Sequence, residues 1–160
     1  MPKIISNLWF AKDAREAVEF YVSVIPNSTA GASTTVPADT PSGPPGSVQV
    51  IAFKLGDQNF IALEAGPFDP FNHAFSILVE CDSQAEIDRI WDAFIANGGE
   101  PEQCGWLKDR WGLSWQIVPR ALGEMIAGTD REAAKRATEA MLGMVKLAIA
   151  ALERAYRGEP

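Results

Sequence analysis

The sequence predicts an α+β fold of two βαβββ repeats followed by C-terminal amphipathic helices. The order of a strand, an Asp-capped helix, a stop at Asn or Gly and further strands occurs twice, with Asp13 and Asp82 at equivalent places. After the second set of strands, strong helix formers dominate and no strand signal remains. These observations divide the chain into one domain at 1–120, with repeat one at 1–66 and repeat two at 71–120, and a helical extension at 121–160.

The first repeat opens with a segment, Ile5–Phe10, that alternates in the manner of a strand. Asp13 is the expected cap of a helix whose apolar residues recur at helical spacing up to the stop at Pro26. The remaining predicted elements are a strand at Thr29–Val36, an exposed Pro-rich loop at 37–46, and a hairpin of Val48–Leu55 with Asn59–Glu64.

The second repeat is expected to open with strand His73–Glu80, and Asp82 or Ser83 caps the helix that follows. That helix carries one apolar face and ends at the Asn-Gly-Gly stop, 97–99. Two further strands are predicted at Glu100–Leu107 and Leu113–Pro119, joined by a turn at 108–110 whose charged side chains are expected to be solvated.

The extension is expected to form one or two amphipathic helices that begin near Thr129. Its Met, Leu and Ile residues are too apolar for a free helix, so they must cover the sheet or a partner chain. A homodimer is the expected outcome.

Composition restricts the functions open to this chain. The net charge of -7 repels nucleic acid, and no apolar run approaches the ~20 residues of a membrane span. The N-terminus has no signal-peptide pattern, so a cytoplasmic protein is expected. Cys81 and Cys104 are far apart and lack nearby ligand partners, which indicates reduced structural thiols.

Four segments resemble the PhnB-like branch of the vicinal oxygen chelate superfamily, whose members are also labelled 3-demethylubiquinone methyltransferase-like. These segments are Leu8–Phe10 with Ala17–Tyr21, Val79–Asp82, Gln103–Asp109 and Trp111–Arg120. The Cys-Gly-Trp turn before a strand reading Ser-Trp-Gln-Ile-Val-Pro is the most specific part. The resemblance covers roughly residues 3–157 and implies the glyoxalase/bleomycin-resistance type, in which two repeats form a cupped mixed sheet.

The resemblance also implies where a ligand site lies. Enzymes of the superfamily hold one divalent metal inside the cup, where it stabilises an oxyanion or enolate of a chelated substrate. The corresponding positions fall near Asn7, near Ala62 or Glu64, at Asn72 or His73, and at Gln116. Neutral amides fill most of them and bind first-row metals weakly, so no tightly held metal is expected. If a divalent ion does bind, its ligands are Glu64, His73 and Gln116.

Glu64 and His73 are the candidate catalytic residues. His73 is the only histidine, so imidazole acid–base chemistry near neutral pH must use it, and a structural role at the mouth of a strand is the alternative. Glu64 ends an apolar strand, where it either faces the cup as a general base or is an exposed carboxylate.

The candidate ligand-binding residues are Asn7, Trp9, Asn72, Trp106 and Gln116. Strand alternation sends the Gln116 side chain to the face opposite its two neighbours, where it is expected to hydrogen-bond a ligand. The tryptophans either line a pocket for a flat apolar molecule or belong to the core.

Two functions remain open on these grounds. The cup binds a small organic, aromatic molecule and performs acid–base or weakly metal-assisted chemistry, or it binds and sequesters such a molecule without turnover, as bleomycin-resistance relatives do. A methyltransferase that uses S-adenosylmethionine typically has a Gly-rich turn after its first strand. No such turn follows Ile5–Phe10.

Overall fold

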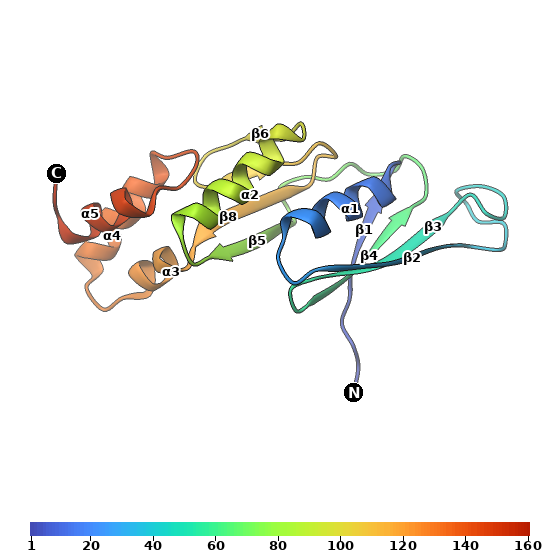
Figure 1. Cartoon of the computed structure of the whole chain (residues 1–160), viewed down its shortest axis with the longest axis horizontal. Helices are drawn as coiled ribbons and strands as arrows, with labels where there is room; N and C mark the ends of the chain where they lie inside the picture. Colours follow the sequence, from blue (N-terminus) through green and yellow to red (C-terminus); the bar gives the residue numbers. More distant parts are fainter. The chain divides into compact units, whose positions relative to one another are not determined.

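The computed structural model describes all 160 residues and forms two compact units, Met1–Pro70 and Phe71–Pro160. Each unit contains one four-stranded mixed sheet (Figure 1). The strand orders are β1-β4-β3-β2 and β5-β8-β7-β6. In the first sheet β1 pairs in parallel with β4, and in the second sheet β5 pairs in parallel with β8. This is the predicted βαβββ arrangement, occurring twice. None of the helices combines the length and the apolar character that a membrane span requires.

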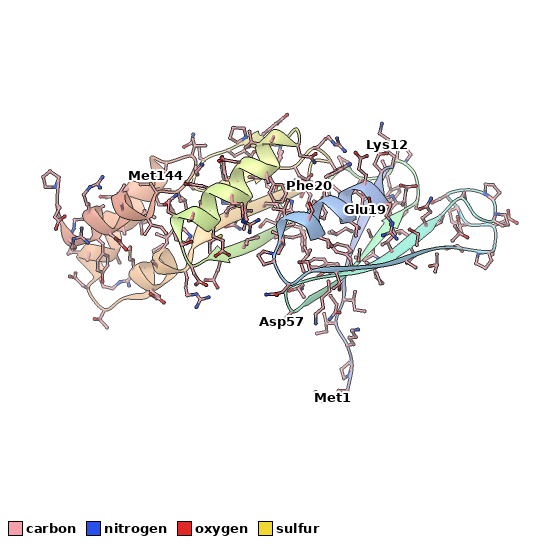
Figure 2. All side chains as sticks on the ribbon, viewed as in Figure 1. Met1, Lys12, Glu19, Phe20, Asp57 and Met144 are labelled. Carbon is pink, nitrogen blue, oxygen red and sulfur yellow. The ribbon has the colours of Figure 1, made fainter.

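The first unit has one helix packed on its sheet. Its elements are β1 (Ser6–Phe10), α1 (Ala14–Val24), β2 (Thr29–Thr35), β3 (Gln49–Leu55) and β4 (Gln58–Glu64). Alternation along β1 buries Leu8 and Phe10, and the face of α1 that carries Val18 and Tyr21 is buried as well. On the outer side of α1, Glu19 is exposed (Figure 2).

The second unit repeats this plan and adds three helices. Its elements are β5 (Ser76–Cys81), α2 (Gln84–Ala96), β6 (Glu100–Pro101), β7 (Trp106–Lys108), β8 (Ser114–Pro119), α3 (Arg120–Ala127), α4 (Arg131–Leu142) and α5 (Ile149–Arg157). Helix α2 is capped by Ser83, whose side chain accepts the backbone N–H of Glu86 at 3.2 Å. Its buried face contacts β8, where the rings of Phe94 and Trp115 lie 4.7 Å apart between centroids.

Two predicted strands of this unit were wrong in extent. The chain turns at residues 72–75 because the Asn72 side chain accepts the N–H of Ala74 at 2.8 Å, so β5 begins at Ser76 and not at His73. The predicted strand Glu100–Leu107 is two short strands, because a turn with a hydrogen bond from the Trp106 N–H to the Gln103 carbonyl interrupts it.

The extension contains three helices, not the expected one or two, and it covers its own sheet. Helix α3, which follows β8 without a break, was not predicted. Leu122, Leu147 and Leu152 form a buried cluster that partly buried residues surround, namely Val118, Met125, Ile126, Ala140, Met141 and Met144.

Polar contacts attach the extension to α2. The Gln84 side chain donates to the Leu147 carbonyl at 3.0 Å and accepts the Ile149 N–H at 2.8 Å. The Lys146 ammonium lies 3.2 Å from Asp88 and 3.1 Å from Asp92. Hydrogen bonds from Gln84 and Lys146 lower the pKa of the Asp88 carboxyl, which shows that its charged form is the one stabilised here.

The loop before β7 is attached to the extension through its backbone. The N–H groups of Cys104 and Gly105 donate to the carbonyls of Met144 and Val145, each at 2.8 Å. Gly105 adopts φ 82°, and a Cβ atom there would lie 2.9 Å from both the Ile117 carbonyl oxygen and a Leu147 methyl carbon. Glycine therefore permits the close approach of loop, sheet and extension.

Candidate ligand-binding site

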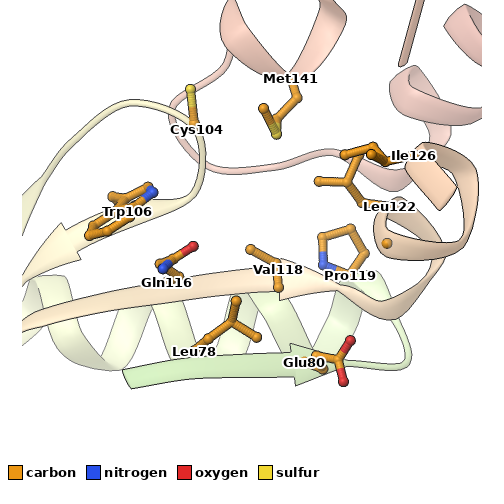
Figure 3. Close-up of a pocket in the computed structure, with 11 residues that line it drawn as sticks. Leu78, Glu80, Cys104, Trp106, Gln116, Val118, Pro119, Leu122, Ile126 and Met141 are labelled. Carbon is orange, nitrogen blue, oxygen red and sulfur yellow. The ribbon is translucent and has the colours of Figure 1, made fainter. Parts of the chain in front are cut away.

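A cavity of about 300 Å³ lies in the second unit between the sheet and the extension (Figure 3). The sheet and the loop before β7 supply Leu78, Glu80, Cys104, Trp106, Gln116 and Val118, and the extension with its junction supplies Pro119, Leu122, Gly123, Ile126 and Met141. Most of these side chains are apolar, and the volume is at the lower end of the range for small-molecule pockets. The site therefore suits a small, largely apolar molecule.

Strand alternation along β8 positions the floor of the cavity. Trp115 and Ile117 are fully buried on the face that α2 covers, whereas Gln116 and Val118 line the cavity on the other face. The face predicted for Gln116 is confirmed.

Two hydrogen-bonding groups of the floor are open to a ligand. Gln116 Nε2 donates to Ser76 Oγ at 2.9 Å, which fixes the amide and leaves its oxygen on the cavity side (Figure 3). Trp106 pairs with Gln116 across the β7–β8 ladder, and its indole N–H, turned toward the cavity in Figure 3, has no acceptor in the structure. The floor thus offers one acceptor and one donor beside an apolar wall.

Glu80 is the only charged residue that lines the cavity. Its side chain is exposed and has no ionic partner. Asp82, two residues further, is paired with Arg120 at 3.0 Å. The cavity consequently has a negative group at its edge and no positive one.

His73 and Asn72 lie outside this cavity. His73 Nε2 is 2.9 and 3.1 Å from the two carboxylate oxygens of Glu102, and its ring centroid is 6.0 Å from that of Trp106. Asn72 is engaged in the turn before β5. The catalytic role of His73 and the ligand-binding role of Asn72 stay predictions.

None of the candidates of the first unit is among the residues that line this cavity. Asn7 is exposed on the face of β1 opposite the core. Trp9 shares that face, donates its indole N–H to the Gly66 carbonyl at 2.8 Å, and stacks on Phe68 with centroids 5.1 Å apart. Their ligand-binding roles stay predictions.

Glu64 is engaged at the start of α1. Its Oε1 accepts the backbone N–H of Ala14 at 2.9 Å. Asp13, the predicted cap, instead adopts a left-handed conformation with φ 62° and makes no side-chain cap, so that prediction was wrong. Glu64 therefore supplies the acceptor that the first turn of α1 needs. Its role as a general base stays a prediction.

Neither unit taken by itself has a donor set that fits a divalent metal. No group of three or more His, Cys, Asp or Glu side chains lies close enough together to hold one. Glu64 caps a helix, His73 pairs with Glu102, and Gln116 offers an amide oxygen. These residues do not form a metal centre within either unit, and we derive no metal-dependent step.

Asp109 belongs to a buried network, so the prediction that it is solvated was wrong. Its Oδ1 accepts the N–H groups of Trp111 and Leu113 at 2.9 and 3.0 Å, and its Oδ2 accepts the indole N–H of Trp115 at 3.0 Å. Only 4% of Asp109 is exposed. The carboxylate holds the β7–β8 turn in place beneath the sheet.

Both cysteines are free thiols. Burial raises the pKa of the Cys81 thiol to about 12, and the nearby charges of Glu86 and Asp82 act in the same direction. Cys104 lines the cavity and is only partly buried.

The cavity residues of the extension were not predicted. Met141 belongs to the apolar set that predicted a covering role, whereas Leu122 and Ile126 lie on α3, which was not predicted. An apolar pattern does not by itself show that the cover leaves a cavity. Gly123 carries no signal of its own.

Comparison with known proteins identifies relatives of the two repeats. The family model described as 3-demethylubiquinone-9 3-methyltransferase matches residues 2–118, so the whole extension lies outside the match. A PhnB protein from Bacillus cereus with the same description is 28% identical, with a TM-score of 0.62, over 74% of this chain and 99% of that chain. No curated protein matches the sequence.

Two more distant structures share the fold. Protein PA1353 from Pseudomonas aeruginosa is 24% identical with a TM-score of 0.58, over 74% of this chain and 98% of that chain. The fosfomycin resistance protein FosX from Listeria monocytogenes is 17% identical with a TM-score of 0.56, over 77% of this chain and 94% of that chain. The glyoxalase/bleomycin-resistance fold is thereby confirmed.

Proposed function

The chain belongs to the 3-demethylubiquinone-9 3-methyltransferase family, the PhnB-like branch of the vicinal oxygen chelate superfamily, and we propose that it binds a small, largely apolar organic molecule in the cavity of its second unit. The observation that carries this proposal is the cavity itself, with an apolar wall and the open amide oxygen and indole N–H of Gln116 and Trp106. Buried apolar surface supplies affinity, and the two polar groups supply orientation.

Methyl transfer, which the family description names, has less support in this chain than ligand binding has. Neither β1 nor β5 is followed by a Gly-rich turn, since the residues after them read Ala-Lys-Asp and Asp-Ser-Gln. Binding and sequestration need no such turn.

Gly123 offers a direct test of the site. It lines the cavity on α3, and a Cβ atom added there would meet nothing within 4 Å. Gly123→Leu is expected to fill part of the cavity and, because leucine favours helices, to leave the fold intact. Gly123→Ala is the matched control, since it gains helix propensity and adds only one methyl group.

The measurement is calorimetric titration with indole, a flat uncharged probe. Wild type and Gly123→Ala are expected to bind within about 3-fold of each other, and Gly123→Leu at least about 10-fold more weakly. Absence of binding to the wild type, or equal binding by Gly123→Leu, would contradict the proposal.

Acid–base chemistry at His73 is a second candidate, favoured by its pairing with Glu102 beside Trp106. It predicts that the wild type converts a bound compound to a product that mass spectrometry detects, and that His73→Gln binds the compound without converting it. Conversion that persists in His73→Gln would rule out this role.

A further inference from the structure

We propose that the preferred ligand of this cavity is a small apolar molecule that carries a protonated amine, an inference that rests on the binding function proposed above. Charge, spacing and size each contribute to it.

Glu80 gives the cavity a negative charge at its edge. Its carboxylate is the only charged group that lines the cavity, and no Lys, Arg or His side chain lines it. Arg120, which follows the lining residue Pro119, is already paired with Asp82 at 3.0 Å. A ligand that brings its own positive charge therefore gains a partner, whereas an anionic ligand meets a like charge.

The register of β5 and β8 sets the spacing between the carboxylate of Glu80 and the amide of Gln116. Leu78 pairs with Gln116 and Glu80 with Val118, so the carboxylate and the amide lie two residues apart along the strands. The rise of two residues along the strands, combined with the spacing between the two strands, makes this diagonal separation about 8 Å. A ligand that reaches both groups has its ammonium about that far from its hydrogen-bond donor.

The apolar wall and the cavity volume limit the size of the ligand. The apolar body would pack beneath Leu122, Ile126 and Met141, and a cavity of about 300 Å³ limits it to a small one (Figure 3). A bicyclic ring with a short aminoalkyl chain has this size, and its ring N–H can donate to the Gln116 oxygen.

Three probes that share the indole ring system separate the effect of charge from that of shape. Tryptamine is a cation, indole is neutral, and indole-3-propionate is an anion. The proteins are the wild type, Glu80→Gln, and Glu124→Gln as a control. Glu124 is an exposed carboxylate on α3 that does not line the cavity, so both variants change the net charge equally.

In calorimetry at low salt, the wild type is expected to bind tryptamine most tightly, indole less tightly and indole-3-propionate most weakly. Each exposed charge contact is worth about 2- to 5-fold, so the first and last probes should differ about 10-fold. Glu80→Gln is expected to bring all three within about 2-fold of one another, while Glu124→Gln keeps the wild-type order.

The outcomes separate this inference from the proposed function. If the wild type binds indole but does not prefer tryptamine over indole-3-propionate, the cationic preference is overturned and the binding function stands. If the preference survives in Glu80→Gln, the assignment of Glu80 is overturned. If none of the three probes binds, both proposals are contradicted.

Discussion

Substitution of Asp109 is expected to lower the stability of the protein strongly, because its two buried carboxylate oxygens accept hydrogen bonds from three N–H groups. An amide keeps only one accepting oxygen, so Asp109→Asn leaves at least one buried N–H facing another donor. We expect the free energy of unfolding to fall by about 2–3 kcal/mol in urea titrations. Asp82→Asn, which breaks an exposed ion pair, should cost below about 0.5 kcal/mol. Equal losses in the two variants would refute the role of the network.

Glu64 affects stability through the first turn of α1. Glu64→Ala removes the acceptor of the Ala14 N–H and should lower the free energy of unfolding by about 1 kcal/mol. Glu64→Gln retains an oxygen and should lose less. Urea unfolding measures both, and an unchanged Glu64→Ala protein would show that the cap carries no stability.

The two thiols should differ in reactivity. At pH 8 an uncharged alkylating reagent is expected to label Cys104 and to spare Cys81. The Cys81 thiol is buried, and its pKa of about 12 keeps it protonated. Since this pKa lies above the ordinary 9.0, the contribution of the protonated thiol to stability is complete below pH 9 and is lost as the pH rises toward 12. Mass spectrometry of the labelled peptides decides, and equal labelling of both thiols in the folded protein would contradict the burial.

Residue positions were predictable where they depend on local alternation. Gln116 lies on its predicted face because every second residue of β8 points the same way. The capping role of Glu64 was not predictable, because its partner lies 50 residues away in the sequence. The burial of Asp109 also escaped prediction, because its charged neighbours suggest a solvated turn.

Among the elements, the extension is a wall of the site, and Gln84 on α2 is one of its polar attachments. Gln84→Ala loses the hydrogen bonds to the Leu147 carbonyl and the Ile149 N–H. We expect a loss of about 1–2 kcal/mol in the free energy of unfolding, together with weaker indole binding, because the wall is less well fixed. Gln103→Ala is a suitable control, since that exposed side chain makes no hydrogen bond. Equal indole affinity in both variants would show that the attachment does not support the cavity.

The helical periods of α1, α2, α4 and α5 were predictable because their apolar residues recur on one face. Helix α3 was missed because it starts directly from β8 at Pro119 without a polar cap, and Gly123 lies in its middle. Apart from Gly123 its residues favour a helix, and contact with the Leu122 cluster stabilises it further.

For the whole molecule, relatives confirm the two repeats and leave most of the extension unmatched. The extension packs most of its apolar residues on its own unit, whereas Leu142 and Val145 remain exposed. The homodimer and the cytoplasmic location stay predictions. The central claim is that a cavity made jointly by a family repeat and this extension is the ligand site.

An NMR titration of ¹⁵N-labelled protein with indole tests that claim most directly. The five tryptophans give five indole N–H signals, and Trp106 and Trp9 represent the cavity and the first unit. The account predicts the largest shift for Trp106, together with the side-chain amide of Gln116, while Trp9, bound to the Gly66 carbonyl, stays unchanged. A shift of Trp9 with Trp106 unmoved would contradict it.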